Sequence, residues 1–358
     1  MTKKIAYIIT RSDIGGAQNH LISLIKHFSQ KYKLLLIVGS EGALTDVAES
    51  HGADVRVVKS LDSANFFSAI YELRKHLNLH QPDVVHTHSS LASLYGRIAA
   101  KMCNINTVYT VHGWHFANLN NPFKARCQIM VEFLLKRLTS QWIVVSLFDK
   151  DLGQQYKLFN KNAVECIPNG VPDLQSGQHV RKDTHFKLVF VGRASYQKNY
   201  LAAIEILEQS HKQVSLTIYT SGREVAELLT RVETSPAKGR CEVIVDANNA
   251  GSLLNQYDLM IVTSRYEGMP LSVLEGLRAG LPIVSTDVCG MKEIVRPENG
   301  YLVSLENVVD ISKWVEMLRL DEGLRTAMSK ASRALYEAQF TETDMLASVE
   351  YVYTRLLK

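Results

Sequence analysis

The sequence lacks the features of a disulfide-stabilised protein, a zinc protein and a membrane-spanning protein. Its cysteines are odd in number and show no CxxC spacing, which indicates reduced thiols in a cytoplasmic protein; they are Cys103, Cys127, Cys166, Cys241 and Cys289. No apolar run approaches the roughly 20 residues that a membrane-spanning helix needs. Near the start, the apolar residues 5–9 are soon followed by Arg11 and Asp13, so we expect no signal peptide.

Two motifs for cofactors and metals are also missing. No GxGxxG follows the first predicted strand, which argues against a dinucleotide-dependent oxidoreductase. No Asp-x-Asp stands at the end of a predicted strand. His86 and His88 share one face of a strand, but no nearby carboxylate or thiolate completes a set of metal ligands. We therefore expect no metal site and no bound cofactor.

The charge of the chain is small but unevenly distributed. Over 358 residues the formal net charge is +4, and residues 1–180 carry 19 Lys and Arg against 13 Asp and Glu. This positive excess suits an anionic partner or an anionic membrane surface, although an uneven surface without a partner is an equal alternative. The length allows two domains of ordinary size.

Short apolar segments of strand type alternate with amphipathic helical segments along nearly the whole chain. This β-α-β alternation predicts parallel sheets covered by helices on both faces. It stops at a polar segment rich in Pro and Gly, which is typical of an interdomain linker. The sequence thus predicts an α/β protein with two Rossmann-like domains, residues 1–170 and 187–338, whose parallel sheets face a central cleft. Residues 171–186 form the linker, and residues 339–358 form a C-terminal helix that crosses back to the first domain.

The most informative stretch is residues 263–294, TSRYEGMPLSVLEGLRAGLPIVSTDVCGMKEI. An apolar strand-like run, DLMIVTS, leads into this stretch and another, LPIVSTD, lies near its end; a loop and a short helix lie between them. Pro270 suits the first position of that helix and Gly280 its C-cap, which places Glu267 in the loop and Glu275 inside the helix. The loop follows the carboxyl end of a strand, where α/β sheets bind their ligands.

Other unusual residues also follow predicted strand ends. Gly15 and Gly16 follow the first strand, His112 follows a later one, and Arg193 and Lys198 follow the strand FKLVFVG. A guanidinium and an ammonium at this spacing can clamp a diphosphate, and a glycine pair permits close approach of the backbone to a ligand. Taken singly, each is also explained without a ligand, as a solvated surface cation, a structural histidine or an ordinary turn. Together with the two glutamates, they suit an anionic ligand with a hydroxylated part.

These residues, in this order, resemble the retaining nucleotide-sugar glycosyltransferases that have two Rossmann-like domains, the GT-B type. Within them the sequence resembles glycosyltransferase family 4, which is marked by an E-x7-E motif, here Glu267 and Glu275. The resemblance covers almost the whole chain. It includes GGAQ at 15–18, VHG at 111–113, IPNGV at 167–171, VGRASYQKN at 191–199 and SRYEGMPLSVLEGLRAGLPIVSTDVCGMKEIV at 264–295. In this family the N-terminal domain binds the acceptor and the C-terminal domain binds the nucleotide sugar.

The resemblance implies a role for each matching residue. Arg193 and Lys198 would hold the diphosphate, Glu275 would bind the ribose hydroxyls, and Glu267 would face the donor sugar. His112 would lie near the sugar and the β-phosphate, and it joins Glu267, Lys198 and Arg193 as an expected catalytic residue. The implied transfer retains the anomeric configuration and needs no metal. The other residues expected to contact the donor are Gly15, Gly16, Gly268, Met269, Pro270 and Leu271.

Two segments depart from the family pattern where the nucleotide base is usually bound. YTSG at 219–222 and DANN at 246–249 stand where relatives often carry glycine. The identity of the base is therefore open, and we expect UDP only because it is the most frequent nucleotide in such enzymes.

The acceptor is indicated by the first half of the chain. HTHSSLASLYGRIAA followed by TVHGWHF looks like bacterial enzymes that extend undecaprenyl-diphosphate-linked sugars for capsule, O-antigen or glycoprotein glycans. Aromatic and basic residues on the next predicted helix suit peripheral docking on the anionic inner face of the cytoplasmic membrane, although packing of this helix on its own domain is an equal alternative. The residues assigned to this acceptor and membrane side are Trp114, Phe116, Phe123, Lys124 and Arg126. No nucleic acid is expected as a partner.

Two alternative functions remain open from the sequence. One is a glycosyltransferase of the same fold that acts on a small soluble acceptor, and the other is a relative that binds nucleotides or glycans without catalysis. The complete set of Arg193, Lys198, Glu267 and Glu275 argues against the second, because a degenerate relative often loses one of them.

Overall fold

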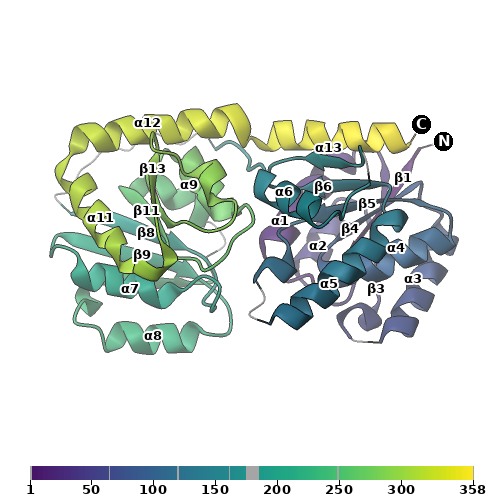
Figure 1. The fold of residues 1–358 in the computed structure, drawn as a ribbon, viewed down its shortest axis with the longest axis horizontal. Helices are drawn as coiled ribbons and strands as arrows, with labels where there is room; N and C mark the ends of the chain where they lie inside the picture. The colour runs from purple at the N-terminus through teal and green to yellow at the C-terminus, as the bar shows by residue number, and fades with distance from the viewer. Residues whose placement is uncertain are drawn as a thin grey trace. The chain divides into compact units, whose positions relative to one another are not determined.

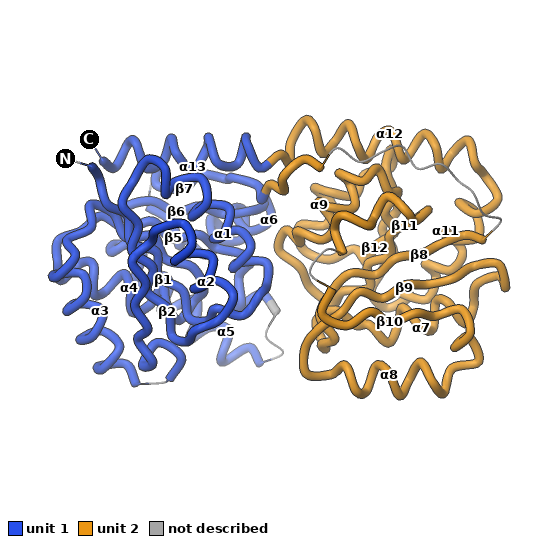
Figure 2. The backbone as a smooth tube through the Cα atoms, turned by 180° about the vertical axis from the view of Figure 1, so that it is seen from behind, with its two compact units in different colours: residues 1–169, 342–358 blue, residues 170–341 orange. Residues whose placement is uncertain are grey.

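The computed structural model describes residues 2–63, 65–118, 121–160, 162–174, 185–247 and 250–357. The chain divides into two compact units: Met1–Asn169 with Glu342–Lys358 form unit 1, and Gly170–Thr341 form unit 2 (Figure 2). Most of the expected linker lies outside the described residues, because 175–184 are not among them. None of the described helices combines the length and the apolar character needed to cross a bilayer.

Unit 1 contains a seven-stranded sheet in which every paired strand is parallel. The strand order is β3-β2-β1-β4-β5-β6-β7. Buried apolar residues run continuously along the central strands, as expected for strands covered on both faces. The strands are β1 (Lys4–Ile9), β2 (Lys33–Val38), β3 (Asp54–Val57), β4 (Val84–His88), β5 (Asn106–Val111), β6 (Gln141–Val144) and β7 (Val164–Cys166).

Helices cover both faces of this sheet (Figure 1). Alternate residues of β1 point to opposite faces, so Tyr7 packs with α1, α2 and α13, whereas Ile8 packs with α3 and α4. The helices of unit 1 are α1 (Gly16–Phe28), α2 (Ala43–Ser50), α3 (Phe66–His80), α4 (Ser90–Met102), α5 (Pro122–Leu135), α6 (Leu147–Gln155) and α13 (Glu342–Leu356), with 3₁₀ turns at Lys59–Asp62, His115–Asn118 and Lys136–Leu138.

Unit 2 contains a second all-parallel sheet, of six strands, in the order β10-β9-β8-β11-β12-β13. Its strands are β8 (Phe186–Val191), β9 (Val214–Thr220), β10 (Cys241–Val245), β11 (Leu259–Val262), β12 (Ile283–Thr286) and β13 (Gly300–Val303). Its helices are α7 (Tyr200–Gln209), α8 (Val225–Glu233), α9 (Leu271–Arg278), α10 (Met291–Ile294), α11 (Ile311–Leu320) and α12 (Glu322–Gln339), with 3₁₀ turns at Lys238–Arg240, Ala250–Gln256 and Leu305–Asp310.

The predicted α/β architecture of two parallel Rossmann-like sheets is confirmed. Two local features differ from the sequence-based expectation. The short edge strand β7 and the single-turn helix α10 were not predicted, because segments of three or four residues carry too little periodicity. The sequence also predicts a short helix near AGSLLNQY at 250–257, and the structure has the 3₁₀ helix Ala250–Gln256 there.

The C-terminal helix α13 packs within unit 1. Val349, Val352 and Tyr353 of this helix are buried with Ile25 and Phe28 of α1 in one apolar cluster. The Tyr353 hydroxyl also lies 2.6 Å from Nδ1 of the buried His86. The last helix in sequence therefore completes the core beside β1 and β4.

A buried ion pair attaches α5 to the rest of unit 1. Arg97 of α4 is fully buried and donates through Nη2 to Glu132 Oε2 at 2.7 Å. The guanidinium also lies 4.7 Å from the ring centroid of Tyr109 and 5.2 Å from that of Trp142. Burial raises the pKa of Glu132, and Arg97 opposes this shift. Glu132 and Leu135 are the only buried residues of α5, so the ion pair is a main attachment of this helix to unit 1.

We predict that replacing only one member of this pair destabilises unit 1. Arg97→Met leaves the Glu132 carboxylate buried without its partner, and breaking such a pair costs about 3–5 kcal/mol of unfolding free energy. Urea denaturation followed by circular dichroism measures the loss. The double variant Arg97→Met with Glu132→Leu is expected to recover most of it, since no unpaired charge then remains; a double variant as unstable as the single one would contradict this account.

Candidate active site

The predicted site residues fall into two groups, one in each unit, and both lie at comparable points of their sheets. In each sheet the strand order reverses once, between β1 and β4 in unit 1 and between β8 and β11 in unit 2. Open α/β sheets bind ligands beyond the carboxyl ends of the strands at this reversal. Gly15 follows β1, His88 ends β4, Lys198 follows β8 and Glu267 follows β11.

In unit 2 the structure brings Lys198 and Glu267 together. Lys198 Nζ donates to Glu267 Oε1 at 2.6 Å, and Ser264 Oγ donates to the same oxygen, also at 2.6 Å. The two side chains are 16% and 5% exposed, so the pair is largely removed from solvent. Two residues that are 69 positions apart in sequence thus form an ion pair at the carboxyl ends of two neighbouring strands, β8 and β11.

A glycine without an assigned role lies against the lysine. A Cβ atom on Gly192 would lie 3.2–3.3 Å from three carbons of the Lys198 side chain, so the absence of a side chain lets Lys198 run close to the end of β8. Arg193, the next residue, is exposed. Burial is the main cause of a raised pKa at Tyr266, and Arg193 is near enough to oppose it. In the sequence, nothing but its position in the segment VGR at 191–193 indicates that Gly192 lies near the site.

Helix α9 begins one residue later than expected. Pro270 is not its first residue but its N-cap, because its ψ of 122° is extended. The C-terminal end matches the predicted glycine stop. Gly280 has a φ of +71°, its N–H donates to Leu277 O, and the N–H of Leu281 donates to Gly276 O, which is a Schellman motif.

The residues between the two glutamates shape the start of this helix. Gly268 and Leu271 are half-buried, whereas Met269 and Pro270 are buried. The free N–H groups of the first turn of α9 lie directly after this segment, and such groups favour anions.

Glu275 occupies the middle of α9 and is half-buried. Burial raises the pKa of its carboxyl group, and Arg278 one turn later opposes the shift. A Cβ on Gly251 would lie 2.7 Å from the Glu275 carboxyl carbon and 2.8–3.0 Å from its oxygens. Gly251 therefore leaves the space that this carboxylate occupies. Sequence reasoning missed Gly251, because it is 24 positions away and belongs to no motif. The nearby Asn248 and Asn249 of the DANN segment lie outside the described residues.

In unit 1 the glycine pair opens helix α1. Gly15 is the N-cap, with an extended φ of −166° that any residue adopts, so its backbone does not explain why glycine stands there. At Gly16 an added Cβ would meet no described atom within 4 Å. Packing of the described chain thus leaves open space beside Gly16.

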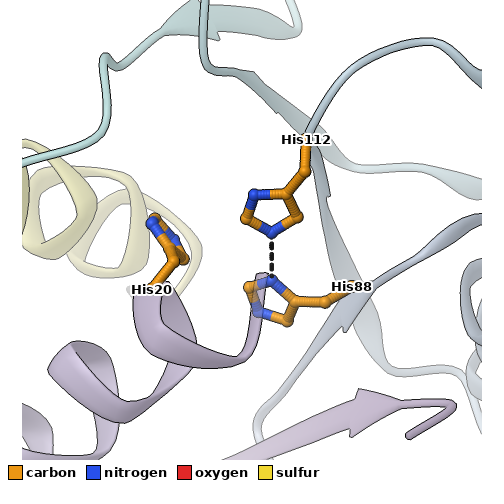
Figure 3. A group of neighbouring side chains, drawn as sticks. All are labelled: His20, His88 and His112. Carbon is orange, nitrogen blue, oxygen red and sulfur yellow. Dashed lines mark hydrogen bonds between the residues drawn. The ribbon is translucent and has the colours of Figure 1, made fainter. Parts of the chain in front are cut away.

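His112 belongs to a cluster of histidines (Figure 3). Its Nε2 lies 3.1 Å from Nδ1 of His88, and its ring centroid is 5.0 Å from that of His20. Gly113 permits the chain to turn after β5 with a φ of +116°. Burial lowers the pKa of all three histidines, to about 4 for His20, so the imidazoles are neutral at pH 7.

The two histidines on one face of β4, His86 and His88, differ in their hydrogen-bond partners. Their rings are adjacent, with centroids 4.3 Å apart, but both nitrogens of His86 already have partners. Nδ1 lies 2.6 Å from the Tyr353 hydroxyl and Nε2 lies 2.7 Å from Thr110 Oγ1. The third member of the cluster with His88 and His112 is His20, which the sequence analysis did not consider.

Trp114 and Phe116 do not belong to an exposed surface. They are 3% and 6% exposed and stack on each other with centroids 5.1 Å apart, and Trp114 Nε1 donates to Asp149 O. They form part of the apolar core of unit 1, which excludes them from a membrane-facing role. Phe123, Lys124 and Arg126 are exposed on α5.

Comparisons with known proteins agree with this architecture. The family described as Glycosyltransferase Family 4 matches residues 14–173, and that described as Glycosyl transferases group 1 matches residues 173–335. The chain is 27% identical over 310 residues to the O-antigen biosynthesis glycosyltransferase WbnH of Escherichia coli, covering 86% of this chain and 87% of that one. It is 26% identical over 355 residues to the UDP-Gal:alpha-D-GlcNAc-diphosphoundecaprenol alpha-1,3-galactosyltransferase of Escherichia coli, covering 92% and 91%.

Among solved structures, the chain is similar to HepE of Anabaena in complex with UDP and glucose. The TM-score is 0.85 at 19% identity, with 99% of this chain and 100% of that chain covered. Two family matches in succession over residues 14–335, on two parallel Rossmann-like sheets, establish the conclusion: this chain belongs to the family 4 glycosyltransferases of the GT-B fold.

Proposed function

We propose that this glycosyltransferase transfers a sugar, with retention of its anomeric configuration, from a UDP-sugar to a lipid-linked saccharide. The observation that carries the proposal is the Lys198–Glu267 pair at the strand-order reversal of unit 2. Two relatives support the choice of substrates. The name of the Escherichia coli galactosyltransferase specifies a UDP-Gal donor and a diphosphoundecaprenol-linked acceptor, and HepE was crystallised with UDP and glucose.

The diphosphate of the donor is held by cations and by a helix terminus. The Lys198 ammonium has three donors, so it can bind a phosphate oxygen while it keeps its bond to Glu267. Arg193 is exposed near the end of β8 and offers a planar fork of donors. The N–H groups at the start of α9 supply further positive potential.

The remaining donor contacts follow from the two glutamates and His112. Glu275, in the space left by Gly251, accepts hydrogen bonds from the ribose hydroxyls through its two oxygens. Glu267 has a second oxygen, Oε2, beyond the one that accepts from Lys198 and Ser264, and it faces the donor sugar. His112, neutral because it is buried, donates or accepts at the sugar and the β-phosphate.

Transfer proceeds by attack on the same face from which the diphosphate leaves. The bond between the anomeric carbon and the β-phosphate oxygen breaks, the acceptor oxygen forms its bond to that carbon, and the acceptor proton passes to the departing diphosphate. No carboxylate forms a covalent intermediate. Charge that develops on the diphosphate is stabilised by Lys198, Arg193 and α9, so these groups replace a metal ion.

The acceptor side is proposed to lie on the anionic inner face of the cytoplasmic membrane. Helix α5 exposes large apolar side chains, among them Phe123 at 73% and Leu134 at 67%. Lys124 and Arg126 on the same helix are exposed as well. A helix that presents both kinds of side chain binds an anionic bilayer surface peripherally, which would bring the enzyme to a lipid-linked acceptor.

We predict that Lys198→Ala and Glu267→Ala each lower transfer by about 10²–10³-fold, as expected when a group that stabilises charge in the transition state is removed. The measurement is release of UDP from a panel of UDP-sugars with a lipid-linked acceptor. Lys212→Ala, which removes an exposed lysine far along the chain from the pair, is the matched control and should keep normal turnover. Near-normal turnover of Lys198→Ala would exclude the proposed role of the pair.

We predict that Gly251→Ala weakens donor binding without unfolding the protein. The added methyl group would lie within 3.0 Å of the Glu275 carboxylate and must displace it from its present position. We expect a rise of roughly tenfold in the KM for the UDP-sugar, comparable to losing a hydrogen bond to a charged group, and an unchanged melting temperature. Gly239→Ala, where a Cβ meets nothing within 4 Å, serves as control. An unchanged KM would show that Glu275 does not bind the donor.

We predict that the protein co-sediments with vesicles containing anionic lipid and not with neutral vesicles. The double variant Phe123→Ser with Leu134→Ser should reduce binding by at least tenfold, since each side chain contributes about 1.5–3 kcal/mol when it is buried. Tyr71→Ser on α3, also exposed, is the control. Equal sedimentation with and without lipid would contradict membrane docking, and activity on a free small sugar alone would favour a soluble acceptor.

A further inference from the structure

Three histidines of unit 1 come from different elements and direct their rings toward one another (Figure 3). His20 lies in α1, His88 ends β4 and His112 follows β5. One ring nitrogen from each lies within 4.8 Å of the other two. Over the described residues, no other group of three or more His, Cys, Asp or Glu side chains meets in this way.

Several nitrogens of this cluster have no partner in the described part of the chain. Neither ring nitrogen of His20 meets the distance and angle limits of a hydrogen bond there, although Asn169 lies close enough to affect its pKa. Nε2 of His88 has no partner in the described chain either. His20 is 2% exposed and His88 is fully buried, so bulk solvent does not supply the missing partners. His86 on the same strand is different, because Tyr353 and Thr110 occupy both of its nitrogens. The ring nitrogens of His20, close to those of His88 and His112, are therefore available to a ligand bound by the cluster.

The spacing of the nitrogens suits a metal ion. His88 Nδ1 and His112 Nε2 are 3.1 Å apart, and two ligands of a tetrahedral ion with bonds of about 2.0–2.1 Å lie about 3.3 Å apart. A shift of roughly 1–2 Å in side-chain position brings all three nitrogens to that separation. Three imidazoles with a fourth position for water or another ligand are a known ligand set for zinc.

We propose that His20, His88 and His112 bind one divalent transition-metal ion, preferably Zn²⁺, and that its binding inhibits sugar transfer. Neutral imidazole is the ligand form, and imidazole nitrogen prefers ions such as Zn²⁺ over Mg²⁺ or Ca²⁺. Inhibition rests on the proposed function, because the ion binds Nε2 of His112 and fixes the orientation of a ring that must meet the sugar and the β-phosphate. The ion is thus an inhibitor and not a cofactor of the metal-independent reaction.

Metal binding is tested without substrates. Metal-free protein is titrated with Co²⁺, and one equivalent should give the intense visible absorption of a four- or five-coordinate site, which Zn²⁺ then abolishes. His20→Gln and His88→Gln should each weaken Co²⁺ binding by at least about tenfold, given that even outer-shell changes cost 10–100-fold. The control is His80→Gln. His76 and His80 stack on α3 with centroids 6.3 Å apart and are the alternative pair of neighbouring histidines in unit 1.

A second measurement does not depend on the variants folding. X-ray absorption of the Zn²⁺-loaded parent protein should show three imidazole ligands. Fewer than three, a lack of intense Co²⁺ absorption, or loss of binding in His80→Gln would each overturn the site.

The inhibitory effect is measured separately in a transfer assay. Zn²⁺ should inhibit the parent and His80→Gln over the concentration range in which it displaces Co²⁺, and inhibition of His20→Gln should require at least about tenfold more. Stoichiometric binding without inhibition would refute the effect on transfer and the proposed role of His112, while leaving the metal site itself established. Inhibition that is unchanged in His20→Gln would assign it to another site.

Discussion

The parallel arrangement of every strand is the constraint on which the rest of this structure depends. Because parallel strands are joined by helices that cross over the sheet, every strand-to-helix loop leaves at the same edge. At the point where the strand order reverses, two neighbouring loops diverge to opposite faces and leave a space between them. In unit 2 this geometry brings Lys198 after β8 beside Glu267 after β11. In unit 1 it brings the end of β4 beside the start of α1, where His88 and His20 lie.

The buried Lys198–Glu267 pair contributes little to stability, in keeping with the donor-binding role proposed for it. Desolvation of a carboxylate and an ammonium offsets most of their attraction, so a buried pair contributes little net stability. One oxygen of Glu267, Oε1, accepts hydrogen bonds from both Lys198 and Ser264. The Lys198 ammonium has two further N–H donors, and among the described residues no other hydrogen bond of its ammonium is seen. Arg97 and Glu132 show the contrasting case. Their pair is enclosed by Tyr109 and Trp142 and joins α4 to α5 inside unit 1, which is a structural role.

The sequence was sufficient for the fold because its periodic apolar segments are long, and the E-x7-E stretch was sufficient for the region of the site. It was not sufficient for contacts that depend on three-dimensional packing. Gly192 and Gly251 lack the Cβ atoms that would crowd Lys198 and Glu275. A glycine outside a turn gives no local sequence pattern from which such a role could be predicted. His20 lies on the buried face of the amphipathic helix α1, where a sequence pattern cannot distinguish it from a core residue. Only the folded chain brings α1 next to the ends of β4 and β5, so that His20 lies beside His88 and His112 (Figure 3). Trp114 and Phe116 carry the composition of an interfacial segment, but they are buried by α6 and its flanking loop.

The histidine cluster also determines how His112 can act on a donor. Three protonated imidazoles within a few ångströms of one another would repel strongly in a buried environment, so burial favours the neutral forms. Between two neutral rings, one nitrogen must donate and the other accept. If His88 Nδ1 carries the proton, His112 Nε2 accepts it, and the proton of His112 must then reside on Nδ1. His112 would thus present a hydrogen-bond donor to a phosphate or sugar oxygen at neutral pH. The same neutral state allows Nε2 of His112 to bind the proposed metal ion when His88 carries its proton on Nε2, so one property of the cluster underlies both proposals for His112.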